Sequence, residues 1–532
     1  MEIVKTSRST LRKVSLCSGI GLLTLMAVAT SAWAAVPERP QTWVDRDHFP
    51  EAYSILTSDR VMFPDDVSDW PLKIDSTHQL FMDDYVISEV EGLTRQFHQP
   101  VKHPKNPLMR GGYANVLYDQ GKGLFRMWNG GRYLTSRDGI SWEAAGTVPV
   151  GYVIYNPDIP EEEGRYKGIT ERRAKPGTEE EEPGGFYVYH SRDGLNWEQR
   201  PKRPVLQRSC NCMFPCEFRP QGAGDPSKFQ YSNPDHFQSY GVGDTSRFRY
   251  DTVLKRYIFD GKWNLLMPEA KIKELGINTE RKPRLKLRTF SESEDLIHWS
   301  PPRFMMYPDR LDPVDRQIYC HVGFVYESMW FGLIQAMKYQ ETGWKQTDLQ
   351  LSYSRDGRHW LRLQHREPFI PLGDATSWEA DYSLSSFTAP VLVGSELFIY
   401  YAGSRNPERD KDPKGQWPLD LGLAKLRRDG FASLNAGGKP GLIVTRPLAF
   451  RGKCLFVNAE VAEGGWVKAA VLTRDSKPMA GYTLDDAVPL IKNTTKGQMT
   501  WKSKGKLAPP GDDHLRIVFQ FKHAKLYSFW IE

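Results

Sequence analysis

The seven-residue pattern "SRDGISW", residues 136–142, returns as "SRDGLNW" at 191–197 and as "SRDGRHW" at 354–360. Weaker copies follow the same order: Ser293, Asp295 and Trp299 are in register, and "RRDGF" keeps Asp429 and Gly430. The spacing is 55 residues from Ser136 to Ser191 and 61 from Ser293 to Ser354. A pattern with this period predicts one structural unit repeated five times.

Short strand-like segments precede each copy of the motif. In the first unit "YANVLYD", "LFRMWNGG" and "RYLTS" alternate apolar and polar residues and are separated by turn residues such as "QGKG". A fourth strand begins after the motif. Five units of four antiparallel strands predict an all-β fold with a five-bladed β-propeller over residues 106–436. A helical solenoid is excluded, because almost no stretch has a helical period.

The motif itself is expected to form the turn from the third to the fourth strand of each blade. Ser and Asp can bond the amides of the turn, Gly supplies a positive φ, and Trp packs between blades. A carboxylate used once in every blade is therefore predicted to be structural. The same residues could bind Ca²⁺ at the surface, so structural calcium is allowed and no cofactor is required.

The N-terminus predicts export. Residues 1–34 have the charged, apolar and small-residue order of a signal peptide, with a signal anchor as the alternative. Nothing later in the chain could cross a membrane. Removal of this segment reduces the formal charge from +6 to +3, which argues little for binding to nucleic acid. We expect a periplasmic or extracellular protein, and no oligomeric state follows from the sequence.

One interval of the repeat is much longer than the others. Ser191 and Ser293 are 102 residues apart, and the excess contains Cys210, Cys212 and Cys216. Their spacing lacks the paired Cys-x2-Cys knuckles of structural zinc, so a disulfide is favoured over a metal site. The insertion is expected on the face opposite the SRDG turns, where it would form a wall over a binding pocket. The alternative is an insertion that has no role in binding.

The remaining segments flank the propeller. Residues 437–532 alternate as strands of a β-sandwich, which is either a docking or glycan-binding accessory or only a packing partner. Residues 35–105 form an N-terminal extension. Its segment "HQLFMDDYVIS", residues 78–88, is expected either to close the ring or to clamp the two domains.

The sequence resembles the five-bladed-propeller glycoside hydrolases, such as families 32, 43, 68, 117 and 130. The resemblance rests on "HQPVKHPKNPLM", "LFMDDYVI", "GDTSRFRYD", "LGLAKLRRDGF" and "LYSFWIE", and it is closest to exported glycosidase-like proteins of polysaccharide-degrading bacteria. It implies a carbohydrate substrate and two carboxylates that project from the innermost strands. One would act as acid, and the other as base or nucleophile.

The starts of the innermost strands supply the candidates for this site. The catalytic candidates are Asp244 in blade three and Glu379 and Asp381 in blade five. The candidates for substrate binding are Arg110, His103, Arg247, Asp315, Gln317, Tyr319 and Trp378. Blade one departs from the family pattern, because "MRGGYANVLYD" has no acid where families 32 and 43 place one.

The leading hypothesis is an exported, exo-acting glycoside hydrolase that cleaves a polysaccharide or oligosaccharide. Arg110, Arg247 and Arg316 near the expected mouth suit an anionic sugar, a uronate or a sulfated glycan, because arginine pairs bidentately with such groups. The alternatives are a noncatalytic glycan-binding propeller and a polysaccharide lyase that acts on a uronate.

Overall fold

A computed structural model describes residues 71–74, 76–172, 185–207, 245–266, 273, 284–300, 303–313, 315–339, 345–405, 419–508 and 514–532. All of them lie within the compact unit Val44–Glu532. The predicted signal peptide, the cysteine cluster and Asp244 lie outside the described residues. Among the residues described, no helix is long and apolar enough to cross a membrane.

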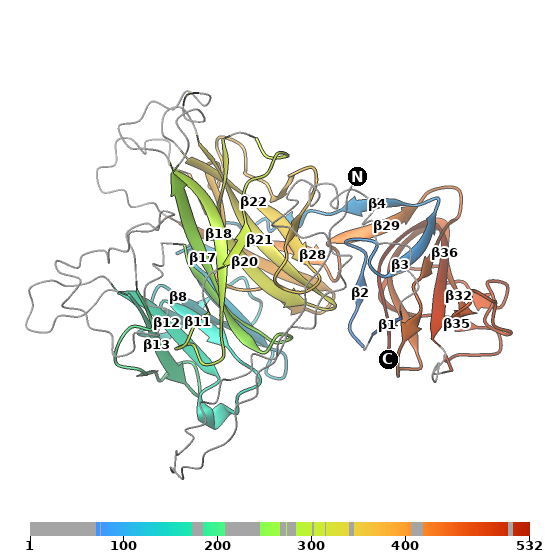
Figure 1. Ribbon diagram of the computed structural model, residues 1–532, viewed down its shortest axis with the longest axis horizontal. Helices are drawn as coiled ribbons and strands as arrows, with labels where there is room; N and C mark the ends of the chain where they lie inside the picture. Colours follow the sequence, from blue (N-terminus) through green and yellow to red (C-terminus); the bar gives the residue numbers. More distant parts are fainter. Residues whose placement is uncertain are drawn as a thin grey trace, which may run out of the picture. The chain divides into compact units, whose positions relative to one another are not determined.

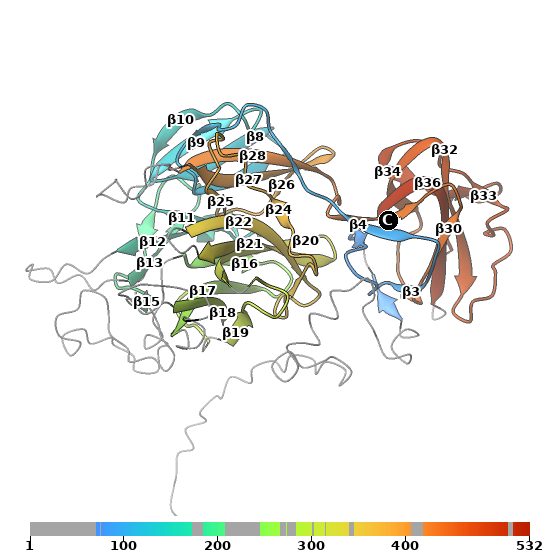
Figure 2. The ribbon, with the colours of Figure 1, turned by 90° about the horizontal axis from the view of Figure 1, so that it is seen from above.

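The chain is all-β, a five-bladed β-propeller followed by a C-terminal β-sandwich (Figure 1). Figure 2 shows the blades following one another round a ring. Blade one contains β7 (Ala114–Asp119), β8 (Leu124–Asn129), β9 (Arg132–Ser136) and β10 (Glu143–Thr147). Blade two contains β11 (Tyr152–Tyr155), β12 (Tyr166–Arg172), β13 (Gly185–Ser191), β14 (Glu198–Gln199) and β15 (Leu206–Gln207), with a 3-10 turn, η1 (Glu161–Glu163), between its first two strands. Blade three contains β16 (Arg247–Asp251), β17 (Arg256–Leu266), β18 (Arg284–Ser293) and β19 (Arg303–Met306).

The last two blades are joined into one sheet by a parallel pair between Thr347 and Tyr382. Blade four contains β20 (Arg316–Tyr326), β21 (Met329–Tyr339), β22 (Lys345–Ser354), β23 (Leu361–Arg362) and β24 (Pro368–Ile370). Blade five contains β25 (Tyr382–Ser385), β26 (Val391–Val393), β27 (Glu396–Ser404) and β28 (Asp420–Arg427). Its outer strand comes from the segment before blade one as β5 (Val101–Lys102) and β6 (Met109–Arg110), which pair with β28 and close the ring.

The SRDG turns have the hydrogen bonds expected from their residues. In blade one, the Ser136 hydroxyl accepts a bond from the Gly139 amide at 2.9 Å, and Asp138 Oδ1 accepts from the amides of Ile140 and Ser141 at 2.8 and 2.7 Å. Burial opposes ionisation of Asp138, but these bonds outweigh it and lower its pKa to about 2. The same pattern recurs at Asp193, Asp295 and Asp356.

The fourth position of the motif requires a left-handed backbone. Gly139, Gly194 and Gly357 have φ values of 71°, 77° and 71°. In blade three, Leu296 replaces the glycine and still takes φ 68°. The side-chain bonds of Ser293 and Asp295 therefore hold a conformation that leucine rarely adopts by itself.

The sandwich is built from both ends of the described chain. Its N-terminal strands are β1 (Leu72–Lys73), β2 (Gln79–Leu80), β3 (Ile87–Glu91) and β4 (Thr94–Phe97). Its C-terminal strands are β29 (Ala432–Ala436), β30 (Gly441–Thr445), β31 (Leu448–Ala449), β32 (Leu455–Thr473), β33 (Ala487–Val488), β34 (Thr494–Gln498), β35 (Thr500–Trp501) and β36 (Leu515–Ile531). Segment 78–88 thus contributes to the sandwich, where β2 pairs with β36, and does not close the ring. The propeller strands end at Arg427, and β29 already belongs to the sandwich sheet.

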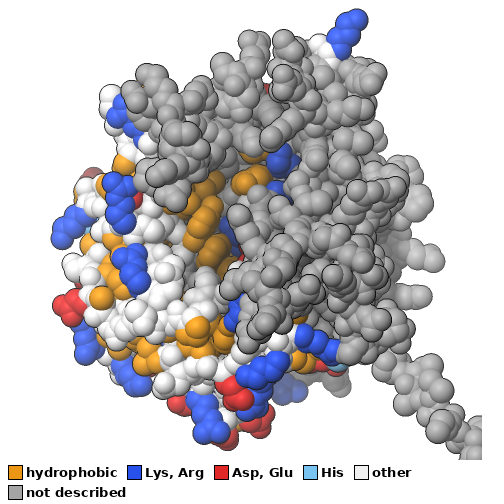
Figure 3. Space-filling model, turned by 90° about the vertical axis from the view of Figure 1, so that its left-hand side faces the viewer, with side chains coloured by type: hydrophobic (Ala, Val, Ile, Leu, Met, Phe, Trp, Pro, Cys, Tyr) orange, Lys and Arg blue, Asp and Glu red, His pale blue; other side chains and the backbone are white. Residues whose placement is uncertain are grey.

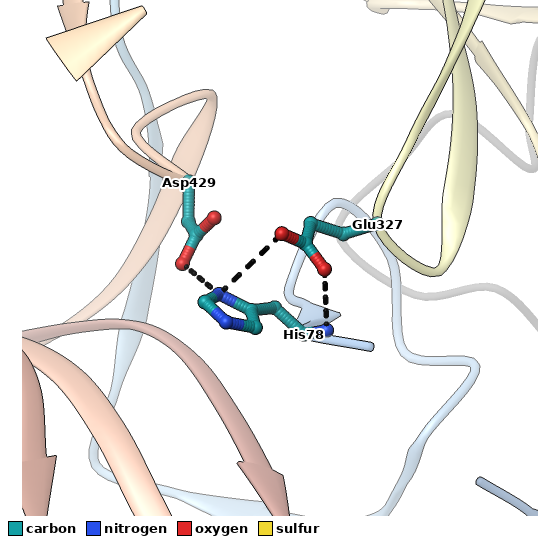
Figure 4. A group of neighbouring side chains, drawn as sticks. All are labelled: His78, Glu327 and Asp429. Atoms are coloured by element: carbon teal, nitrogen blue, oxygen red, sulfur yellow. Dashed lines mark hydrogen bonds and ion pairs between the residues drawn. The ribbon is translucent and has the colours of Figure 1, made fainter. Parts of the chain in front are cut away.

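The aspartate of the fifth motif copy connects blade, extension and sandwich. Asp429 is 1 % exposed and its carboxylate accepts four hydrogen bonds. The donors are His78 Nδ1 at 2.7 Å, the Tyr326 hydroxyl at 2.7 Å, the Ser528 hydroxyl at 2.6 Å and Asn458 Nδ2 at 3.2 Å. Figure 4 shows His78 between Asp429 and Glu327, whose carboxylate accepts the His78 amide at 2.9 Å.

The group His78, Glu327 and Asp429 also places three potential metal-binding atoms within 4.8 Å of one another. Two observations argue against a cation there. Asp429 already accepts four hydrogen bonds, and the Arg428 guanidinium lies 3.4 Å from Glu327 Oε1, so a metal bound there would meet a fixed positive charge. We therefore assign this group to the contact between the domains.

Asp429→Asn should lower the free energy of unfolding by about 2 to 4 kcal/mol, because it removes the charge that four buried donors face. The Asp429 carboxyl is buried, which raises its pKa, but the bonds from His78 and Ser528 outweigh burial, and the pKa falls below its usual value. Its contribution is thus full at neutral pH and is lost as the pH falls below about 4. Chemical denaturation at several pH values measures both effects. The control is Asp138→Asn, at the same motif position but exposed, and it should lower the free energy of unfolding less. Equal losses in the two variants would contradict the role assigned to Asp429 in the contact between the domains.

Candidate active site

The first strands of the blades line the propeller axis. Strand β16 contacts both β11 and β20, so the first strands of blades two, three and four meet. A tyrosine or an arginine lies within the first four residues of each of the five first strands or directly before it: Tyr113, Tyr152, Arg247, Tyr319 and Tyr382. The axis is therefore lined by aromatic rings and one buried guanidinium.

Arg247 lies among these rings and is 6 % exposed. Its guanidinium carbon is 4.5 Å from the ring centroid of Phe387 and 5.4 Å from that of Tyr113. The two rings stack on each other with their centroids 5.0 Å apart and an interplanar angle of 5°. Arg247 Nη1 donates to the Ser246 carbonyl at 2.9 Å. These contacts orient the guanidinium without neutralising its charge.

A cavity of about 180 Å³ lies beside Arg247. It is lined by Arg247, Arg249, Tyr152, Asp260 and Phe387, together with residues 322–325 of β20. Figure 3 shows the propeller end of the chain, with a hollow in which hydrophobic and basic side chains gather. An aromatic wall with a few polar groups is typical of small-molecule sites.

The tyrosines at the axis are neutral at physiological pH. Burial raises the pKa of Tyr319, and Tyr113 adds to this effect, while Arg247 acts in the opposite sense. Burial likewise raises the pKa of Tyr113. These hydroxyls can therefore donate hydrogen bonds to a ligand, but they are poor bases.

The carboxylate that lines the cavity is already paired. Asp260 Oδ1 accepts a hydrogen bond from Arg288 Nε at 2.7 Å, and Oδ2 is 2.6 Å from His321 Nδ1. His321 Nε2 is 3.0 Å from the Ser352 hydroxyl. Burial lowers the pKa of His321, although Asp260 opposes the shift, so the ring is neutral.

Asp260, His321 and Ser352 are bonded in the order of a hydrolytic triad, but a substrate cannot reach the histidine and the serine. His321 and Ser352 are 0 % exposed, and the Trp360 ring lies 4.5 Å from the His321 ring. A Cβ at Gly332 would come within 1.9 Å of His321 Nε2, so this part of the seam is tightly packed. The chain therefore joins blades three and four.

Glu379, a predicted catalytic residue, lies among the outer strands of blade five. Its Oε1 is 2.6 Å from Lys102 Nζ on β5, and Oε2 accepts a bond from the Tyr401 hydroxyl at 3.0 Å. Trp378, a predicted sugar-stacking residue, covers Gly403 and Gly422, where a Cβ would come within 2.4 and 2.8 Å of its ring. These contacts explain both side chains structurally, and their predicted roles stay untested.

The other predicted residues divide between the axis and the periphery. Asp381 directly precedes β25, with its amide bonded to the Ser404 carbonyl. Gln317 is 1 % exposed and accepts bonds from the Lys286 amide and Nζ. The remaining predicted residues have these contacts: Asp315 is 4.0 Å from Lys338 Nζ, exposed Arg110 is 3.2 Å from Asp420, and His103 accepts a bond from the Lys105 amide.

Several residues at the axis and its cavity were not predicted from the sequence, namely Tyr113, Tyr152, Arg249, Asp260 and Phe387. A signal for the first two was present, because a tyrosine or arginine recurs near the start of each first strand. Phe387 follows β25 in an irregular stretch, and no period of the sequence indicates it.

Glu379→Gln should lower the melting temperature, with a loss of about 1 to 3 kcal/mol, because Lys102 and Tyr401 lose their charged acceptor. Differential scanning calorimetry measures this loss. The matched control is Glu396→Gln, which breaks the exposed pair with Lys425 in the same blade and should change stability little. An unchanged melting temperature with abolished turnover would instead support the catalytic role predicted for Glu379.

No family model and no curated protein matches the sequence. Solved structures that match include an N-acetylgalactosamine deacetylase from F. plautii, with 11 % identity and a TM-score of 0.34 over 64 % of this chain and 96 % of that one. A family-32 β-fructofuranosidase of Bombyx mori matches with 10 % identity and a TM-score of 0.35 over 82 % and 94 %. An endo-arabinase from Bacteroides thetaiotaomicron matches with 12 % identity and a TM-score of 0.33 over 62 % and 97 %. Similarity at this level does not assign an activity.

Proposed function

We propose that this protein is an exported, exo-acting glycoside hydrolase whose substrate carries an anionic group and binds at the propeller axis. The observation that carries the proposal is the buried guanidinium of Arg247 among the rings of Tyr113 and Phe387 beside an axial cavity. Aromatic rings pack against sugar faces, and a guanidinium pairs with a carboxylate or sulfate. A cavity of about 180 Å³ suits one chain end better than a continuous polymer.

The acid and base are proposed to come from the starts of two first strands. Asp381 directly precedes β25, and Asp244 directly precedes the described residue Thr245 of blade three. A carboxylic acid at one of these positions can protonate the leaving oxygen, and a carboxylate at the other can accept a proton from the attacking water. Glu379 is the weaker candidate, because Lys102 holds its carboxylate.

A noncatalytic glycan-binding propeller is the second candidate. It is favoured by the pairing of Asp260, the carboxylate that lines the cavity, with Arg288 and His321. The lyase alternative is disfavoured, because burial raises the pKa of Tyr319 and Tyr113, the hydroxyls that would have to act as base.

Turnover of neutral, uronate-containing and sulfated oligosaccharides tests the proposal through the release of reducing ends. Asp381→Asn and Asp244→Asn should each reduce kcat by about 10²- to 10⁴-fold, the usual contribution of one acid or base. Arg247→Met should raise KM for acidic substrates by about 10- to 100-fold and leave KM for neutral ones nearly unchanged. Asp193→Asn, in an SRDG turn, is the control and should retain turnover.

Products with an ultraviolet band of unsaturated uronates would assign a lyase. Glycan binding without product, measured by calorimetry, would assign a binding module. Full activity in both aspartate variants would contradict the acid and base assigned above.

A further inference from the structure

Arg247 and Arg249 form a pair of guanidinium groups at the axial cavity. They are two residues apart on β16, so their side chains leave the strand on the same face, and both line the cavity. Within the described part of the chain, the Nε atoms of both are buried without a hydrogen-bond partner. Two buried donors therefore lie beside a partly open cavity of about 180 Å³.

Nearby acids balance the charge of this pair only in part. Among the described residues, Arg247 forms no ion pair with a carboxylate within 4.0 Å. Arg249 Nη2 is 3.7 Å from Asp251 Oδ2, which also accepts the Trp330 indole N–H at 2.7 Å, so Arg249 has one paired carboxylate. Asp260, the acid of the cavity wall, has Arg288 as its partner. The excess of positive charge at the cavity is therefore that of one guanidinium, Arg247.

An excess of buried charge is costly unless a counter-ion compensates it. The neighbouring walls are apolar, from Phe387, Phe324 and Val322, so water replaces that counter-ion poorly. A charge-assisted hydrogen bond is strong in such surroundings, because the local dielectric constant is low.

We propose that the axial cavity is a binding site for a small anion, held between Arg247 and Arg249. The ligand class is a halide or a carboxylate. It can come from the medium as an inorganic ion or from the substrate as an acidic group, and only in the second case does the site rest on the proposed function.

Bromide titration of the full chain tests the site. Thermal unfolding is followed while bromide replaces a bulky sulfonate at constant sodium concentration. The melting temperature of the wild type should rise and follow a saturation curve, because the ligand binds only the folded state. Arg249→Met should weaken bromide binding at least tenfold, and Arg249→Lys should retain part of it. Arg137→Met, at an exposed arginine bonded to backbone carbonyls, is the control and should bind as the wild type does.

Anomalous diffraction from a bromide-soaked crystal of the wild type makes the test independent of variant folding. We expect a bromide peak between the two guanidinium groups. If glucuronate displaces the bromide, the natural anion is a sugar carboxylate. If bromide stays in place, the natural anion is an inorganic ion. Either result supports the anion site. A cavity without bromide, together with equal bromide responses of wild type and Arg249→Met, would overturn it. Bromide binding by a protein that cleaves none of the glycans would refute the proposed function alone.

Discussion

The hydrogen bonds of one aspartate in the SRDG turn organise the propeller. A single carboxylate oxygen of Asp138 accepts the two amides that follow the turn, and this fixes where the third strand ends and the fourth begins. Repetition of the turn makes successive blades alike, and blades of similar shape close into a ring. The Leu296 backbone shows how strongly these bonds act, because it keeps a positive φ after the glycine is lost.

In the fifth copy of the turn, the motif aspartate contacts side chains of other parts of the chain. Asp429 keeps the position of the motif aspartate, but its donors come from the extension, blade four and the sandwich. The chain leaves the propeller at this point, so the carboxylate meets side chains in place of the amides of a fourth strand. The missing outer strand is supplied from far upstream by β5 and β6. Ring closure and attachment of the sandwich are therefore both set in blade five.

The sequence predicted the local part of this structure well. Blade number, turn chemistry and the sandwich follow from residues that are near one another in the chain. The site was harder, because side chains there meet across long separations. Glu379 has the expected position near a first strand, yet Lys102, which is 277 residues earlier, holds its carboxylate. Segment 78–88 has a strand pattern, but no pattern indicates that its partner is β36.

Two buried arginines near the axis, Arg288 and Arg247, differ in how their charge and their donors are compensated. Arg288 donates to Asp260 and to the carbonyls of Tyr319 and Thr245, so its charge and its donors are both satisfied. Arg247 has aromatic faces and one carbonyl, and its Nε lacks a partner among the described residues. Aromatic contact alone compensates a desolvated guanidinium only in part. The anion proposed for the axial cavity would supply the negative charge that Arg247 lacks.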